Sequence, residues 1–134
     1  MILLCDEDVG TGIPHALIDV GLEARALVRI GLGGKDDTTW LPVAGRNGWL
    51  VFSHNKKMLT VALEKQAVID HNVGIVFLTT GEENIVTQLR MLLSRWPALE
   101  LLDATVPRPF ARFVRPDGHM TDTFNYRGTW LSIP

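Results

Sequence analysis

Short apolar runs alternate along the chain with segments of helical periodicity, and most of the runs end abruptly at polar residues. The runs cover residues 2–5, 23–28, 49–52 and 75–78, and each is too short for an amphipathic helix. Because such runs are typical of buried parallel strands, they predict four strands of one sheet. A less regular alternation over residues 110–115 predicts an edge strand.

The segments between these runs carry the spacing and the end signals of helices. They predict one helix from residue 11 to Gly21 and a second from Asp36 to the turn at Asn47-Gly48. A third helix is predicted over residues 58–69, and its expected apolar face comprises Leu59, Ala62, Leu63 and Ala67.

The most regular amphipathic pattern lies between residues 82 and 96. It predicts a helix that ends at Pro97, because proline lacks the N–H that would continue the hydrogen-bond ladder. The expected buried stripe comprises Ile85, Val86, Leu89, Leu92, Leu93 and Trp96.

The alternation of strands and helices predicts an α/β fold, a three-layer α/β/α sandwich around a mainly parallel sheet. Right-handed crossovers would bring the carboxyl ends of the strands to one rim. We assign residues 1–115 to this domain. Residues 116–134 form a C-terminal tail that is either flexible or docks Phe124, Tyr126 and Trp130 on a partner.

Composition and charge narrow the class of protein. A chain of 134 residues is the size of one domain, and its net charge of −2 excludes binding of nucleic acid through overwhelming positive charge. Cys5 has no second cysteine to pair with and lies in an apolar run, so a buried thiol in a reducing cytoplasm is expected. No apolar stretch approaches the length that crosses a bilayer, so no membrane partner is expected.

Three consecutive acids, Asp6, Glu7 and Asp8, follow the first apolar run directly. In open α/β sheets ligands bind beyond the carboxyl ends of the strands, so these acids would project toward a pocket. Adjacent carboxylates repel one another, and a hard divalent cation such as Mg²⁺ or Mn²⁺ would offset their charge. The alternative is a solvated turn whose acids favour the start of the next helix.

Other polar residues are expected at the same rim. If the first and third strands are neighbours, Asp6 and Asp8 meet the turn of residues 53–57, and the start of the second helix adds Asp36 or Asp37. Such a carboxylate cluster is able to hold a metal ion for phosphodiester hydrolysis. Nearby cations would contact an RNA backbone, although each taken alone also fits a solvated surface; these are Lys35, Lys56 and Lys57.

Three segments together resemble the PIN-like fold, nearest the small group related to VapC toxins. They are Asp6-Glu7-Asp8, the stretch 33–41 that reads Gly-Gly-Lys-Asp-Asp-Thr-Thr-Trp-Leu, and the stretch 48–57 that ends in His-Asn-Lys-Lys. The corresponding phrases of that group are an Asp-Glu-Asn opening, Ser-Asp-Glu-Glu-Trp and Thr-Lys-Asp-Lys. The resemblance extends over residues 1–95.

This resemblance implies an endoribonuclease that depends on Mg²⁺ or Mn²⁺ and is the toxin of a toxin–antitoxin pair. Its implied partners are an RNA substrate and a cognate antitoxin protein, and an apolar patch on the last long helix or on the aromatic tail would favour a homodimer. Carried over by position, the catalytic residues would be Asp6, Asp37 and Asn55. The metal ligands would be Asp6, Glu7, Asp8 and Asp37.

One position departs from the family pattern. An acid is expected where this chain has Asn55, and an amide supplies a neutral oxygen in place of a charged one. We therefore keep a second hypothesis, a catalytically weakened PIN-like module that binds RNA or protein. A third, less favoured hypothesis is a receiver-like signalling domain. His54 is a further candidate for a base or a metal ligand, because the ordinary pKa of histidine lies near neutrality.

Overall fold

A single mixed sheet forms the centre of the protein. The structure is a computed structural model and describes residues 1–80 and 83–124. Within these residues six strands lie in the order β2-β1-β3-β4-β5-β6, with β1 to β5 parallel and β6 antiparallel to β5. The mainly parallel α/β fold is thus confirmed. The strands are β1 (Leu3–Cys5), β2 (Ala24–Ala26), β3 (Leu50–Ser53), β4 (Gly74–Leu78), β5 (Phe110–Val114) and β6 (Met120–Phe124).

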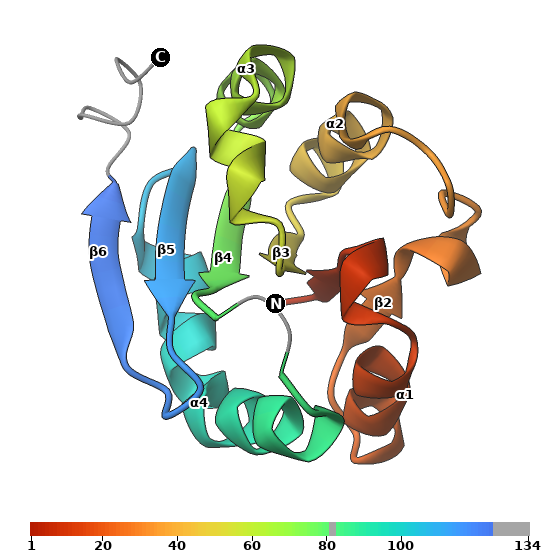
Figure 1. Ribbon diagram of the computed structural model, residues 1–134, viewed down its shortest axis with the longest axis vertical. Coiled ribbons are helices and arrows are strands. Elements are labelled where there is room, and N and C mark those ends of the chain that lie inside the picture. The colour runs from red at the N-terminus through yellow and green to blue at the C-terminus, as the bar shows by residue number, and fades with distance from the viewer. Residues whose placement is uncertain (81–82, 125–134) are drawn as a thin grey trace.

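In the described ranges of the chain, four α-helices cover the two faces of this sheet and complete the three layers. The helices α1 (Gly12–Asp19) and α4 (Ile85–Thr105) lie on one face, and α2 (Asp37–Asn47) and α3 (Ala62–Asp70) lie on the other (Figure 1). Three short 3₁₀ helices lie between strands and α-helices, namely η1 (Glu7–Val9), η2 (Leu27–Ile30) and η3 (Lys56–Thr60). The first and the third directly follow β1 and β3 at the rim predicted to carry the acids.

The strands divide their side chains between two cores. Successive residues of a strand point to opposite faces, so Leu3 and Cys5 pack toward α1 and α4, whereas Leu4 packs toward α2 and α3. All three side chains are essentially fully buried. Burial on both faces explains why the strands read as continuous apolar runs.

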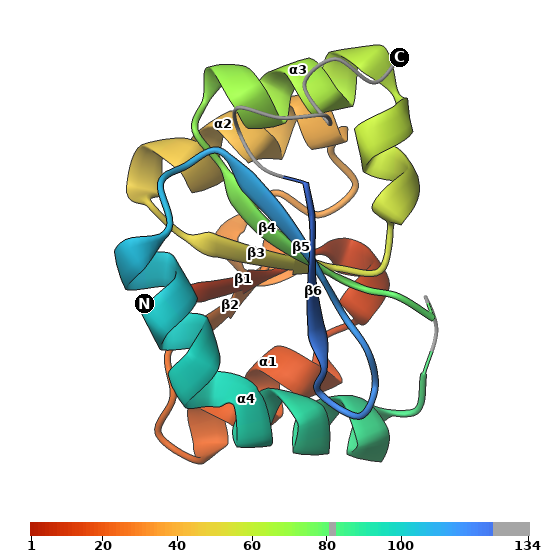
Figure 2. The same ribbon diagram turned by 90° about the vertical axis from the view of Figure 1, so that its left-hand side faces the viewer.

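The last strands differ from the expected arrangement. The predicted edge strand, β5, lies inside the sheet because β6 pairs with it as an antiparallel neighbour (Figure 2). The intervening turn folds the chain back, with Gly118 N–H donating to the carbonyl of Arg115. Phe124 is the last residue of β6, while Tyr126 and Trp130 lie outside the described residues.

The predicted apolar face of the third helix is wrong in part: Leu59 is buried and Ala67 packs against the core as expected, but Ala62 and Leu63 are exposed. Instead of one helix, the segment forms η3, whose Met58 and Leu59 are buried, and then α3, in which Val68 is the buried residue. The change from 3₁₀ to α geometry rotates the later side chains away from the expected stripe. Leu63 is consequently 75% exposed.

The expected end of the fourth helix at Pro97 is also wrong. Helix α4 continues through Pro97 to Thr105, and Figure 2 shows that it bends along its course. Proline removes one ladder hydrogen bond, but burial of Trp96 before it and Leu99 after it holds both halves on the sheet. Neither α4 nor any other helix in the described parts of the chain combines the length and apolarity needed to cross a bilayer.

The buried stripe of α4 differs from the predicted one as well. Leu92 and Trp96 are buried as expected, but Ile85 and Val86 at the start of the helix are 54% and 63% exposed. A polar residue, Gln88, is buried in their place with 3% exposure.

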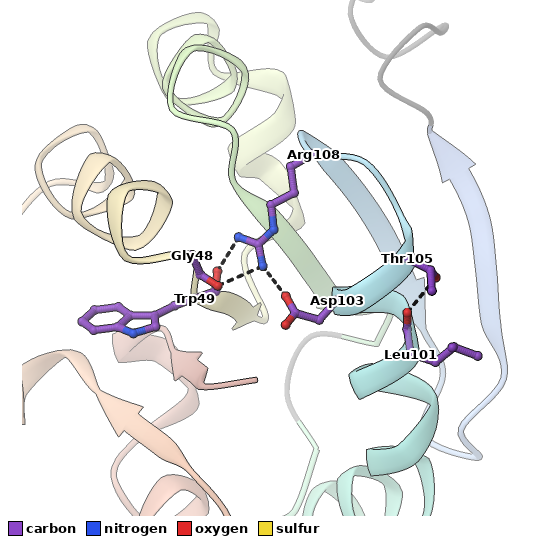
Figure 3. A network of polar contacts seen from close by, with 6 residues as sticks. All are labelled: Gly48, Trp49, Leu101, Asp103, Thr105 and Arg108. Carbon is purple, nitrogen blue, oxygen red and sulfur yellow. Dashed lines mark hydrogen bonds and ion pairs between the residues drawn. The ribbon is translucent and has the colours of Figure 1, made fainter.

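A network of polar contacts around Arg108 joins the residues before β3 to the end of α4. The guanidinium of Arg108 donates to the carbonyls of Trp49, at 2.9 Å, and Gly48, at 3.2 Å, and it pairs with Asp103 (Figure 3). These carbonyls directly precede β3, whereas the acids predicted to be functional follow the carboxyl ends of the strands. The contacts of Arg108 therefore fix the start of β3, at the rim of the sheet opposite the candidate site.

Candidate active site

The structure brings most of the predicted site residues to one pocket. Strands β1 and β3 are hydrogen-bonded neighbours, and the segments that follow them surround a cavity of about 570 Å³ together with the start of α2. Its lining residues are Asp6, Glu7, Asp8, Asp37, His54, Asn55, Lys56 and Lys57. Lys35 lies instead in an adjoining cavity of about 390 Å³, which shares Asp37 with the first.

Asp6 is the most buried acid of the pocket, with 6% of its surface exposed. Its Oδ1 accepts the backbone N–H of Glu7 at 2.7 Å, and its Oδ2 accepts the hydroxyl of Ser53 at 2.8 Å. Burial and the charge of Asp8 nevertheless raise the pKa of Asp6 to about 7. The two hydrogen bonds orient this carboxylate and only partly offset the cost of its negative charge.

Ser53 is a site residue that the sequence did not single out. It ends β3 with no exposed surface, and its hydroxyl also accepts the backbone N–H of Asn55 at 2.9 Å. The hydroxyl thereby couples Asp6 to the turn that carries Asn55. A receiver-like domain would need an accessible aspartate at the end of the third strand, whereas this position has the buried Ser53, with Asn55 two residues after it.

Asp8 lies on η1 and contacts the turn after β3. Its Oδ1 accepts the backbone N–H of His54 at 3.3 Å. Burial raises the pKa of Asp8, while this hydrogen bond acts in the opposite direction. Asp6 and Asp8 therefore form a pair of partly desolvated carboxyls whose charges destabilise one another.

Glu7 makes a different contact from the two aspartates beside it. Both of its carboxylate oxygens accept the backbone N–H of Gly34, at 3.1 and 3.2 Å. The glycine-rich loop is thus tied to η1 by the middle acid of the cluster. This contact gives Glu7 a role in placing the loop that leads into α2.

Asp37 enters the pocket from the first turn of α2. The indole Nε1–H of the buried Trp40 donates to its Oδ1 at 2.9 Å, which orients the carboxylate. The spacing of three residues places both side chains on one face of the helix. Trp40 belongs to the motif that resembles the family, but the sequence did not predict its hydrogen bond to Asp37.

Glu64 is an acid near the site that the sequence did not indicate. It lines the adjoining cavity beside Asp37, and burial followed by the charge and hydrogen bonding of Asp37 raises its pKa. Its position in the first turn of α3 gave no signal, because contact with Asp37 arises only when α2 and α3 pack together.

The lysines and histidines considered from the sequence lie partly at the pocket and partly elsewhere on the surface. The ammonium group of Lys56 donates to the carbonyl of Thr79 at 2.5 Å, so it bridges the ends of β3 and β4. Lys57 is exposed at the mouth of the cavity. Of the four histidines, only His54 lines this pocket, and the exposed His15, His71 and His119 do not.

The chemistry of the pocket fits a hard divalent ion held by few protein ligands. Asp6, Asp8 and Asp37 line one cavity, and burial together with the charges of Asp8 and Asp37 raises the pKa of Asp6. Over residues 1–80 and 83–124, however, no three His, Cys, Asp or Glu side chains are spaced as a ready metal cage. Mg²⁺ is commonly held by one or two carboxylates, with water and substrate phosphate completing its coordination, so the donor set is compatible with it.

Comparison with known proteins gives one match. A protein-family profile described as "PIN like domain" matches residues 1–80, which include β1 to β4 and every lining residue of the 570 Å³ pocket. Searches of curated proteins and of solved structures each returned no match.

Proposed function

Because this chain belongs to the PIN-like domain family, we propose that it is a metal-dependent endoribonuclease that hydrolyses RNA phosphodiesters. The fold is of a nuclease type, and PIN-like domains are generally dependent on divalent metals. The main support for the proposal is that Asp6, Asp8 and Asp37, which come from two distant segments of the chain, line one open pocket. Chance surface acids would not be expected to share one such cavity.

Asp6, Asp8 and Asp37 would hold a Mg²⁺ or Mn²⁺ ion. When bound, such an ion supplies Lewis-acid activation of the phosphodiester. The chain itself orients the acids: Ser53 fixes Asp6, and Trp40 fixes Asp37. These hydrogen bonds restrict the orientation of the two carboxylates.

The cations at the mouth of the pocket would position RNA. Lys57 is exposed beside the acids, and Lys56 lies next to it, tied to Thr79. An ammonium group that contacts a phosphate contributes to affinity without reading base sequence. We therefore propose that these lysines orient the backbone, while Lys35 contacts it farther along, at the adjoining cavity.

We further propose that the protein is the toxin of a toxin–antitoxin pair. The resemblance of its three motif segments to the VapC-related group supports this role. Exposed apolar side chains on α4 would supply surface for an antitoxin or for a second copy of the chain; they are Ile85, Val86, Leu93 and Leu101. Co-expression with the product of the adjacent reading frame, followed by light scattering, tests both partners.

Replacing Asp37 with asparagine tests the nuclease proposal. We expect the purified protein to cleave structured RNA with Mg²⁺ or Mn²⁺ but not with chelator, and Asp37→Asn to lower the rate by about 100-fold. The exposed Asp19 on α1 provides a matched control, because Asp19→Asn removes the same charge far from the pocket. Equal cleavage with chelator, or equal loss in both variants, would contradict the proposal.

A second candidate function is supported by two observations. Asn55 lines the pocket where the family pattern has an acid, and the described acids are not preassembled as a metal cage. Both fit a PIN-like module that binds RNA or protein with little or no cleavage. Retained RNA binding without metal-dependent cleavage would favour this function.

Restoring the missing acid distinguishes the two candidates. We expect Asn55→Asp to tighten Mn²⁺ binding by about tenfold, because a full negative charge replaces an amide oxygen at the pocket. RNA cleavage should rise with it. Calorimetric Mn²⁺ titration and cleavage rates at saturating metal are the measurements, and an unchanged or lower rate would contradict the expectation that the amide of Asn55 weakens the site.

A further inference from the structure

The buried side-chain amide of Gln88, on α4, contacts a residue that lines the candidate site. Gln88 is 3% exposed and lies among the apolar residues with which α4 covers the sheet. It does not line the 570 Å³ pocket, yet its side chain contacts His54, which does. A polar side chain in this position costs desolvation unless its hydrogen bonds are made.

The contacts of Gln88 determine which nitrogen of His54 carries the proton. The Gln88 Nε2 group donates to the carbonyl of Glu83 at 2.6 Å, which leaves Oε1 facing the histidine. Oε1 lies 2.7 Å from Nε2 of His54 and is able only to accept. The Nε2 atom of His54 must therefore be the donor, and in the neutral ring the lone pair lies on Nδ1.

The remaining contacts of His54 hold the ring and its backbone in place. Its ring packs edge-on against Phe52, with ring centroids 5.8 Å apart, and its backbone N–H donates to Asp8. Nδ1 is covered, and no hydrogen-bond partner for it occurs among the described residues. Hydrogen bonds thus run from the carbonyl before α4, through Gln88 and His54, to a carboxylate of the pocket.

We propose that Gln88 is a positioning residue of the active site, which fixes the Nε2-protonated tautomer of His54 and thereby seats the turn of residues 53–57 against Asp8. The role rests on the proposed ribonuclease function. Gln88 does not contact the reacting groups, so its effect should fall on the rate of the chemical step. Small displacements of an oriented group lower rates substantially even when substrate binding persists.

Two Gln88 variants and one control test this role. In Gln88→Leu the acceptor is lost, and we expect kcat to fall about tenfold with KM within about twofold of the parent value. In Gln88→Glu an acceptor oxygen remains, and kcat should recover to within about threefold. The control Gln66→Leu removes an exposed glutamine of α3 that bonds Asp70, and it should change neither parameter.

The tautomer of His54 provides a readout that does not depend on activity. In ¹⁵N-detected imidazole spectra we expect a protonated Nε2 in the parent protein and in Gln88→Glu, and loss of this single tautomer in Gln88→Leu. A protonated Nδ1 in the neutral parent ring would overturn the proposal, as would a Gln88→Leu protein with altered tautomer and unchanged kcat. A parent protein that cleaves no RNA removes the ribonuclease function and this catalytic role with it, while the spectra still decide whether Gln88 orders His54.

Discussion

Replacing Asp6 with asparagine is expected to abolish RNA cleavage and, at pH 8, to make the protein more stable. The loss of activity should reach about 100-fold or more, because the oriented charge at the centre of the pocket disappears. The gain in stability follows from removing a buried negative charge that Asp8 destabilises. Asparagine retains an oxygen for the Glu7 N–H and a group able to bond Ser53.

The stability gain should depend on pH in a defined direction. The pKa of Asp6 is about 7 in the folded protein against an ordinary value of 3.8, so the folded state binds this proton more tightly. The wild type therefore loses stability as pH rises from about 4 to 7, whereas Asp6→Asn lacks this titration. We expect the variant to gain about 2–4 kcal/mol over wild type between pH 4 and pH 8, measured by urea unfolding.

Divalent metal should reverse this difference. Mn²⁺ at 100 times its dissociation constant would stabilise the wild type by about 2.7 kcal/mol, and it should stabilise Asp6→Asn much less. Asp19→Asn again serves as the exposed control and should follow the wild type in chelator and in metal. A stability difference that stays constant from pH 4 to pH 8 would contradict the assigned electrostatics of Asp6.

Replacing Gly45 with alanine is expected to cause a large loss of stability. Gly45 lies in the last turns of α2, where the helix packs against the end of α3. A Cβ atom at this position would lie 2.0 Å from the carbonyl oxygen of His71. Because the clashing atom belongs to the backbone, one of the two elements must move as a body.

We expect Gly45→Ala to lower the free energy of unfolding by about 3 kcal/mol or to prevent folding. Gly12→Ala is the matched control, since it also adds one methyl to a helical glycine. There the nearest atom is the flexible tip of Ile85 at 3.2 Å, so the change should stay within about 1 kcal/mol. Urea unfolding of both proteins measures the contrast, and equal stabilities would show that α2 and α3 separate without cost.

The family resemblance and much of the fold could be read from the sequence because they depend on local patterns. Short apolar runs predicted β1, β3 and β4 to within a residue or two, because strands buried on both faces require apolar side chains at every position. The acids after the first run were expected at the rim because parallel strands end on the same side. The structure places Asp6, Asp8 and Asp37 there together.

The predictions for the third and fourth helices failed because tertiary packing outweighed the local preferences of the sequence. Pro97 signalled a helix end, but burial of Trp96 and Leu99 on either side of it carries α4 across the missing hydrogen bond. Leu63 fitted an apolar stripe whose phase was lost when η3 replaced the first turn of the expected helix. In both cases the energy of packing exceeds the local preference.

The sequence by itself determined the order of strands and helices as far as β5 and the kinds of side chain available at the rim. Only the tertiary structure decided how these side chains are paired: Ser53 with Asp6, Glu64 with Asp37, and Gln88 with His54. The physical reason is that these contacts join segments far apart in the chain, so no periodicity or spacing records them. They form only after the helices have packed on both faces of the sheet.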